Sequence, residues 1–322
     1  MKGKKYKMRA FLFPGQGSQK IKMGLDLYEN FAEAKEVFDE VDSALNQKLS
    51  AVIFGDDAEA LNKTENTQPA MLAMSIATLR VIENQSGKKL PELCNFVAGH
   101  SLGEYSALVA ADAMPLSVGA RLLQVRAKAM AESAPNGVGA MMAIIGLSIE
   151  QVRDVCEKAS DTTKNDVCSV ANDNCTGQVV ISGHRGAIER AEGIAKEMGA
   201  KRALILPVSV PAHCPLMQHA KEVVENALCE ITLKEPSVPF VSNRTAAVEM
   251  DVKNIKEQLG LQMISGVRFR ESVGYMVEKG VTEFVEVGAG NVLSGLVKRT
   301  TDKATQVNVG TVDAVEAFLK TL

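Results

Sequence analysis

The chain has 322 residues, of which 46% are hydrophobic, and its net charge of −3 comes from 36 basic and 39 acidic residues mixed along the sequence. This length can bury a large core, and the mixed charge shows no basic stripe of the kind that binds nucleic acid. No apolar run approaches the ~20 residues that span a bilayer, and the basic start lacks a signal-type core, so we expect a cytoplasmic protein without membrane contact.

The first predicted strand, Ala10–Phe13, ends at the turn Pro14-Gly15-Gln16-Gly17. Glycines on both sides of Gln16 permit unusual backbone angles and would expose its N–H group. An ordinary polar turn residue accounts equally for this pattern, so turn chemistry alone leaves the role of Gln16 open.

The second predicted strand, Phe96–Ala98, leads into Gly99-His100-Ser101-Leu102-Gly103-Glu104, and a helix-like run follows from Glu104 to Ala111. A serine between two glycines at a strand-to-helix turn is the sequence pattern of a nucleophile elbow. The turn exposes the serine hydroxyl, and the helix N-terminus supplies unpaired N–H groups beside it. The segment therefore predicts covalent acyl chemistry on Ser101, either transfer or hydrolysis.

Arg126 follows within Arg121–Met130, a stretch predicted to be a helix. A surface arginine is the ordinary interpretation. However, the residues three or four positions away on the helix are apolar: Leu122, Leu123, Ala129 and Met130. A guanidinium on such a face, if it borders a cleft, is suited to bind a carboxylate in a bidentate pair.

Residues 138–207 are predicted to form a small subdomain inserted into a larger α/β domain, residues 1–137 and 208–322. The order β-α-β-β-α-β is that of a ferredoxin-like unit, with elements at Met141–Ile145, Ile149–Ala159, Val167–Val170, Val179–Ile181, Ala187–Met198 and Arg202–Leu206. Turn residues at 135–137 and Pro207 bracket the unit. With further strands at Phe240–Val241 and Phe284–Val287, the larger domain is predicted to be α/β-hydrolase-like with a mostly parallel sheet.

The four histidines are the candidates for the base that Ser101 needs. His100 adjoins the serine, and its side chain should point away from it. His184 is interpreted as a solvated loop group and His219 as a surface group. His213 follows an apolar strand-like run and a proline, where loops deliver catalytic groups from strand ends, and is the preferred base.

Metal and nucleotide sites are not predicted. The six cysteines (Cys94, Cys156, Cys168, Cys175, Cys214 and Cys229) form no C-x-x-C pair, so we expect reduced and mostly buried thiols. Gly288-Ala289-Gly290-Asn291 follows a strand, but it lacks the third glycine of a dinucleotide fingerprint.

Four segments in this order resemble malonyl-CoA:acyl carrier protein transacylases: Phe13–Gln19, Asn66–Ala70, Gly99–Glu104 and Val210–Met217. The resemblance covers nearly the whole chain, from about Arg9 to Glu286–Leu293. It implies transfer of a malonyl group from malonyl-CoA to the phosphopantetheine thiol of holo-acyl carrier protein through a malonyl-serine, which supplies fatty acid chain elongation. It implies no metal or redox cofactor, and we expect a monomer.

The resemblance also implies roles for individual residues. Ser101 is the nucleophile and His213 its base, while the N–H groups of Gln16 and Leu102 form the oxyanion hole. Arg126 holds the malonyl carboxylate.

Three further positions follow from the same resemblance. The main-chain carbonyl of Gln262, rather than an acid, accepts the second N–H of the catalytic histidine. In this segment Gly266 and Phe269 stand where the family commonly has proline and tryptophan, so the loop path departs from the family pattern here. Contacts with coenzyme A or pantetheine are implied for Asn174 and for the basic pair Lys201-Arg202.

Three alternatives stay open. A serine esterase or thioesterase would need an acid between Ser101 and His213 in the chain, and the available residues are Asp154, Asp161, Asp166 and Asp173. A non-catalytic scaffold that binds acyl carrier protein would not need Ser101, His213 and Arg126 to be retained. An acyltransferase of a polyketide or malonate decarboxylase system would share the fold and the motifs.

Overall fold

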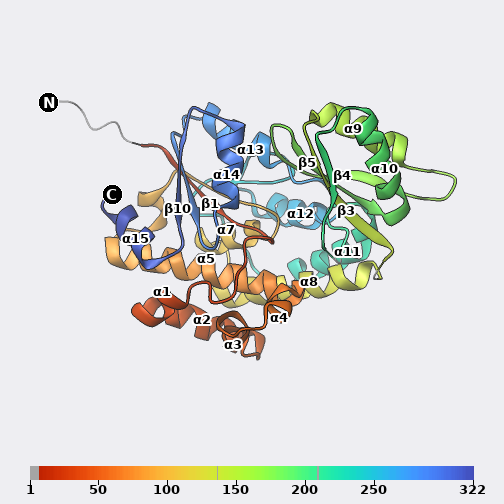
Figure 1. Cartoon of the computed structure of the whole chain (residues 1–322). Coiled ribbons are helices and arrows are strands. Elements are labelled where there is room, and N and C mark those ends of the chain that lie inside the picture. The colour runs from red at the N-terminus through yellow and green to blue at the C-terminus, as the bar shows by residue number, and fades with distance from the viewer. Residues whose placement is uncertain (1–6, 136, 209) are drawn as a thin grey trace.

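The computed structural model describes residues 7–135, 137–208 and 210–322 of the chain. Figure 1 shows a larger sheet, beside which the C-terminus lies, and a smaller sheet next to it. The larger sheet is mostly parallel and helices pack against both sheets, which confirms the predicted α/β class. Asn136 of the predicted turn and residues 1–6 of the predicted large domain lie outside the described residues.

The larger sheet has the strand order β10-β9-β1-β2-β7-β8, and its pairs are parallel except for β7 with β8. The strands are β1 (Arg9–Phe13), β2 (Phe96–Gly99), β7 (Phe240–Val241), β8 (Val248–Glu249), β9 (Glu283–Val287) and β10 (Thr305–Val309). Parallel strands end at one edge of a sheet, so the turns that follow β1 and β2 meet there. Gln16 and Ser101 are therefore delivered to the same edge.

Helices cover both faces of this sheet because its strands are apolar on both sides. Phe11 and Phe13 of β1 join the core on one face, whereas Ala10 and Leu12 join the core on the other. The first core packs against α1 (Leu25–Asn30), α2 (Ala32–Leu45), α3 (Leu49–Phe54), α4 (Ala58–Asn62), α5 (Thr64–Ser86), α6 (Leu90–Leu93), α7 (Gly103–Ala110), α8 (Leu116–Ser133), α11 (Gln218–Cys229), α12 (Val252–Gln262) and α15 (Val312–Leu319). The second packs against α13 (Phe269–Glu278) and α14 (Val292–Thr300).

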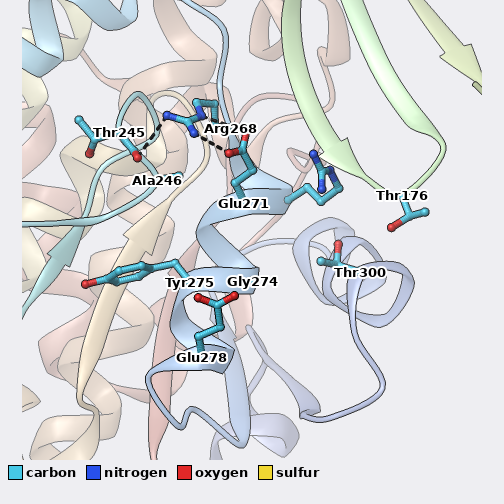
Figure 2. A pocket seen from close by; sticks show the side chains of 10 residues that line it. Thr176, Thr245, Ala246, Arg268, Glu271, Gly274, Tyr275, Glu278 and Thr300 are labelled. Carbon is cyan, nitrogen blue, oxygen red and sulfur yellow. Dashed lines mark hydrogen bonds and ion pairs between the residues drawn. The ribbon is translucent and has the colours of Figure 1, made fainter. Parts of the chain in front are cut away.

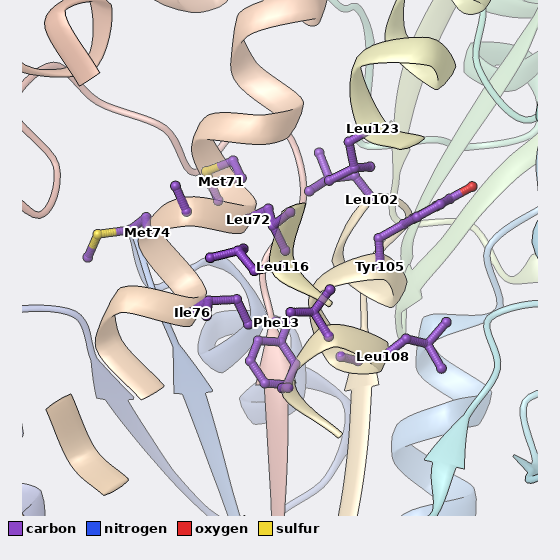
Figure 3. Packing of buried hydrophobic residues seen from close by; sticks show 14 of the residues in the cluster. Phe13, Met71, Leu72, Met74, Ile76, Leu102, Tyr105, Leu108, Leu116 and Leu123 are labelled. Atoms are coloured by element: carbon purple, nitrogen blue, oxygen red, sulfur yellow. The ribbon is translucent and has the colours of Figure 1, made fainter. Parts of the chain in front are cut away.

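The first core supports the elbow from below. Figure 3 shows Phe13 of β1 among side chains of α5 and α7, including Ile76 and Leu108. Leu102, the residue after Ser101, is buried in the same core. The buried Leu102 side chain fixes one end of the turn. This packing restricts the position of the neighbouring Ser101 relative to the sheet.

The smaller sheet is antiparallel and has the order β4-β5-β3-β6. Its elements follow the predicted β-α-β-β-α-β order: β3 (Gly139–Ile145), α9 (Ile149–Ala159), β4 (Cys168–Cys175), β5 (Gln178–His184), α10 (Arg185–Glu197) and β6 (Arg202–Ile205). The apolar stripes of α9 and α10 pack on one face of this sheet, where Val155 and Ile188 meet Met142. Figure 1 shows both helices on the outer side of the smaller sheet.

The predicted strand ends at Val170 and the next begins at Val179, whereas in the structure β4 continues through Cys175 and the turn is only Thr176-Gly177. The strand continues because its end is bonded to residues 267–270 as well as to β5. Asp173 donates its N–H to the Val267 carbonyl at 2.9 Å and receives Arg270 in an ion pair at 2.7 Å. Asp173 therefore connects the end of β4 to the start of α13.

A short 3-10 helix, Pro215–Met217, follows His213 and leads into α11. Within the described ranges, no helix is both long enough and apolar enough to cross a membrane. Strands β8 and β10 had no counterpart in the sequence prediction.

Candidate active site

Ser101 occupies a strained turn that only close packing can hold. Its φ is +55°, in the left-handed region that residues with a Cβ rarely adopt. A Cβ on Gly99 would lie 1.9 Å from the Gly103 carbonyl carbon, and one on Gly103 would lie 2.1 Å from the Phe13 carbonyl oxygen. The two glycines are thus required by backbone contact, as the elbow pattern predicts, and the strain is concentrated at the residue with the hydroxyl.

Ser101, His213 and Gln262 are joined by two successive hydrogen bonds. Ser101 Oγ lies 2.8 Å from His213 Nε2, and His213 Nδ1 lies 2.9 Å from the main-chain oxygen of Gln262. Gln262 is the last residue of α12, where main-chain carbonyls have lost their partners within the helix. His213 itself has a φ of +61°, so both side chains of this pair stand on strained backbone.

The partners fix the tautomer of His213. Because a carbonyl oxygen only accepts, Nδ1 carries the proton and Nε2 is free to accept from the Ser101 hydroxyl. Burial, and then the positive charge of Arg126, lower the pKa of His213 to about 3. The imidazole is therefore neutral near pH 7, which is the form that a general base requires.

Arg126 is buried, at 1% exposure, and points at the serine. Its Nη2 donates to Ser101 Oγ at 2.9 Å and to Gln262 Oε1 at 3.0 Å, while Nη1 donates to Gln68 Oε1 at 2.7 Å. All three partners are neutral, and the Nε donor has no acceptor among the described residues. A buried charge that is held only by neutral groups is an incomplete ion site, so this position suits an incoming carboxylate.

The two candidate oxyanion donors lie on adjacent turns. A Cβ on Gly15 would come within 2.5 Å of the His100 carbonyl, so the Gln16 turn packs directly on the elbow. Leu102 precedes α7, where N–H groups at a helix start are free. The Ser101 N–H, by contrast, is bound to Asn243 Oδ1 at 2.8 Å and is therefore not free to act as an oxyanion donor.

Two buried residues, to which the sequence prediction gave no function, brace the elbow. Asn243 follows β7 and donates from Nδ2 to the Gly99 carbonyl at 2.6 Å. Glu104 accepts the Asn243 N–H at 2.6 Å and a bond from Gln262 Nε2. Burial raises the pKa of Glu104 to about 7. The available signal for Asn243 was its position just after a parallel strand, and Glu104 was visible within the elbow motif.

The three residues expected to touch coenzyme A or pantetheine differ in burial and in distance from the elbow. Asn174 is buried beside the elbow, and its Oδ1 lies 2.8 Å from His100 Nε2. Lys201 and Arg202 are exposed at the start of β6, where their neighbours are Ile145 and Gly146. The structure therefore brings Asn174 to the site, and it gives no contact between the basic pair and Ser101.

The other three histidines, all among the described residues, form no hydrogen bond with the Ser101 hydroxyl. His100 packs on Phe269, with ring centroids 5.5 Å apart, in agreement with its predicted packing role. His184 lies at the end of β5 and accepts the Val167 N–H at 2.9 Å, so it is part of the sheet rather than a solvated loop group. His219 is exposed, as predicted.

A separate surface hollow of about 450 Å³ lies beside α13 (Figure 2). Its guanidinium groups are paired: Arg268 binds Glu271, as the dashed line shows, and Arg270 binds Asp173. Ser101, His213 and Arg126 are not among its lining residues. Among the residues that the structure describes, no cluster of His, Cys, Asp and Glu side chains could hold a metal ion.

Comparison with known proteins gives one consistent family. The model of the acyl transferase domain matches residues 10–314. A relative from Bacillus subtilis (strain 168), named malonyl CoA-acyl carrier protein transacylase, is 45% identical and covers 97% of this chain and 96% of its own. An acyl-carrier-protein-S-malonyltransferase from Bartonella henselae has a crystal structure with a TM-score of 0.94 at 44% identity, covering 98% and 99%. A structure of a type II PKS acyl-carrier protein in complex with its malonyl-transacylase matches with a TM-score of 0.93 at 39% identity, covering 98% and 100%.

Proposed function

The chain belongs to the acyl transferase domain family, and from this membership we propose that it is an acyl-carrier-protein S-malonyltransferase. It transfers the malonyl group of malonyl-CoA to the phosphopantetheine thiol of holo-acyl carrier protein, which supplies malonyl units for fatty acid chain elongation. The observation that carries the proposal is the buried guanidinium of Arg126 at 2.9 Å from Ser101 Oγ, itself 2.8 Å from His213 Nε2.

The first half-reaction makes an ester on Ser101. The hydroxyl oxygen attacks the thioester carbonyl of malonyl-CoA while His213 Nε2 takes its proton. The Gln16 and Leu102 N–H groups stabilise the oxyanion. When the intermediate collapses, the C–S bond breaks, the sulfur of coenzyme A takes the proton from Nε2, and malonyl-serine remains.

The second half-reaction reverses these steps with another thiol. His213 removes the proton of the phosphopantetheine thiol of the carrier protein, and the sulfur attacks the ester carbonyl of malonyl-serine. The C–O bond then breaks, and Ser101 recovers its proton from His213. Each proton and acyl group moves among Ser101, His213 and the two substrates, so the proposed mechanism requires no cofactor.

Arg126 selects the acyl group. The free carboxylate of the malonyl group supplies the negative charge that the buried guanidinium lacks, and an acetyl group cannot. The Gln262 carbonyl orients His213 in place of an acid, which argues against an esterase triad built on Asp173, since that carboxylate is occupied by Arg270.

The finer architecture belongs to this proposal. We interpret residues 138–207 as a ferredoxin-like subdomain inserted into an α/β-hydrolase-like domain of residues 1–137 and 208–322, with the active site between them. The separate antiparallel sheet and its own apolar core support this division. A monomeric, cytoplasmic protein remains the expectation, as do contacts of Asn174, Lys201 and Arg202 with coenzyme A or pantetheine.

Intact-mass spectrometry tests the function directly. The protein is incubated with malonyl-CoA or acetyl-CoA without carrier protein, and a malonyl adduct on Ser101 that moves to added holo-acyl carrier protein is expected. Ser101→Ala should form none. Release of coenzyme A without a lasting adduct would favour hydrolysis, and absence of any reaction would favour a scaffold. Because one solved relative is bound to a type II PKS carrier, carriers of both fatty acid and polyketide types should be compared.

A further inference from the structure

Glu104 is a buried carboxylate in the first turn of α7, the helix that follows Ser101. It is 1% exposed, and its bonding partners are amides: the main-chain N–H of Asn243 and the side-chain amide of Gln262. Burial of a carboxylate without a directly bonded cation is costly, and all that these partners do is donate to it. The proposed reaction gives this residue no step, so the burial needs another explanation.

The hydrogen bonds of Gln262 permit one orientation of its amide. Nε2 donates to the Ser101 carbonyl at 3.0 Å and to the Glu104 carboxylate. The carbonyl can only accept, and so can the carboxylate in its ionised form. Oε1 accepts from Arg126 Nη2 at 3.0 Å. A flipped amide would set Oε1 against two acceptors and Nε2 against the guanidinium donor. Glu104 and the Ser101 carbonyl therefore decide which way the Gln262 amide points.

Gln262 contacts both Arg126 and His213. The Gln262 side chain holds Arg126, while the main-chain carbonyl of the same residue holds His213 Nδ1 at 2.9 Å. The Gln262 amide also lies between the Glu104 carboxylate and the Arg126 guanidinium. A direct Glu104–Arg126 ion pair would already fill the position that a malonyl carboxylate takes, whereas the intervening amide leaves that position free.

We propose that Glu104 is a positioning residue for acyl-group selection, which acts through the Gln262 amide to hold Arg126 ready for a carboxylate. The inference rests on the proposed function, because it concerns the choice between malonyl and acetyl groups. Glu104 touches no reacting atom, and its effect on the choice of acyl group passes through Gln262.

The Glu104→Gln variant tests this role with little change in shape. Its amide has one acceptor and one donor facing two donors, the Asn243 N–H and Gln262 Nε2, so one bond must be lost or Gln262 must flip away from Arg126. We expect the rate of Ser101 acylation by malonyl-CoA to fall about tenfold or more, as loss of a charge-assisted hydrogen bond allows. Acylation by acetyl-CoA should fall much less, so the malonyl-to-acetyl ratio decreases.

Glu286→Gln is the matched control. Glu286 is equally buried and also accepts two N–H groups, from Leu293 at 3.0 Å and Ser294 at 2.8 Å, but it caps α14 instead of touching Gln262. The same substitution there should lower the unfolding midpoint and leave the malonyl-to-acetyl ratio unchanged. A ratio that falls in both variants would show a general effect of disturbed packing and would overturn the proposal.

Equal loss of malonyl and acetyl rates in Glu104→Gln, or no loss, would also overturn it. Should that variant fail to fold, Gln262→Met removes the amide and keeps the main-chain carbonyl, so the same fall in the ratio is expected, and an unchanged ratio counts against the proposal. Measurement of the wild-type protein distinguishes a failure of the proposed function from a failure of the role of Glu104. Absence of a malonyl preference in the wild type refutes the function, whereas a preference that survives these substitutions refutes only the role of Glu104.

Discussion

Replacement of Arg126 by methionine is the sharpest test of how the site selects its acyl group. Methionine keeps the length and helix propensity of the side chain in α8 but removes the charge and all its donors. The change withdraws donors from Gln68, Gln262 and Ser101 Oγ, and it also removes the cost of a buried cation. The two effects oppose each other, so we expect the variant to fold.

The magnitude follows from the lost contact. A charge-assisted hydrogen bond to the malonyl carboxylate is worth about 1.5–3 kcal/mol, which corresponds to roughly 10–150-fold in kcat/KM for malonyl-CoA. Acetyl-CoA has no carboxylate to lose, and without the Arg126 charge the pKa of His213 rises, which makes it a stronger base. Acylation by acetyl-CoA should therefore be maintained or increase, and the preference for malonyl should narrow or reverse.

Single-turnover acylation of Ser101, followed by rapid quench and intact mass, measures both substrates without the carrier protein. Arg121→Met is the matched control, because Arg121 lies on the same helix and is exposed. It should leave both rates as they are. If Arg126→Met slows malonyl and acetyl transfer by the same factor, Arg126 supports the fold of the site and does not bind the malonyl carboxylate. The proposed malonyl specificity would then be refuted.

Other predictions concern the base, its protonation and the elbow. His213→Ala should slow acylation by about 10²–10⁴-fold, as loss of a general base does, with a far-UV circular dichroism spectrum like that of the wild type; a smaller loss would assign the base elsewhere. Because the folded pKa of His213 is about 3 and its ordinary value 6.5, acylation should persist as pH falls through 6.5, and Arg126→Met should move the acid limb of the pH profile to higher pH. The same shift means that the stability from neutral His213 is present above pH 6.5 and is lost as pH falls toward 3, so the free energy of unfolding should decrease over that window. Gly103→Ala sets a Cβ 2.1 Å from the Phe13 carbonyl oxygen and should lower the free energy of unfolding by about 1–3 kcal/mol or more in denaturant titrations, whereas a neutral effect would contradict the close approach.

The local parts of this protein follow from its sequence. Gly99, Ser101 and Gly103 define the elbow because strand, turn and helix are adjacent in the chain, and a tight turn depends on neighbouring residues alone. The order of elements in residues 138–207 and helix α9 at Ile149–Ala159 were predicted for the same reason, since periodic apolar residues identify each element. The apolar neighbours of Arg126 on its helix likewise indicated a buried face.

Tertiary structure decided the rest, because the remaining contacts join residues far apart in the chain. The partners of Arg126 come from α5, α12 and the elbow, so its neutral surroundings were not visible from its own helix. Asn243 braces the elbow from the end of β7. Strand β4 extends beyond its predicted end at Val170 because Val267 and Arg270 supply partners for Asp173. The sequence indicated which residue types the chemistry needs, and the orientation of Gln262 between Glu104 and Arg126 arose only when the packed sheets and helices brought these three side chains together.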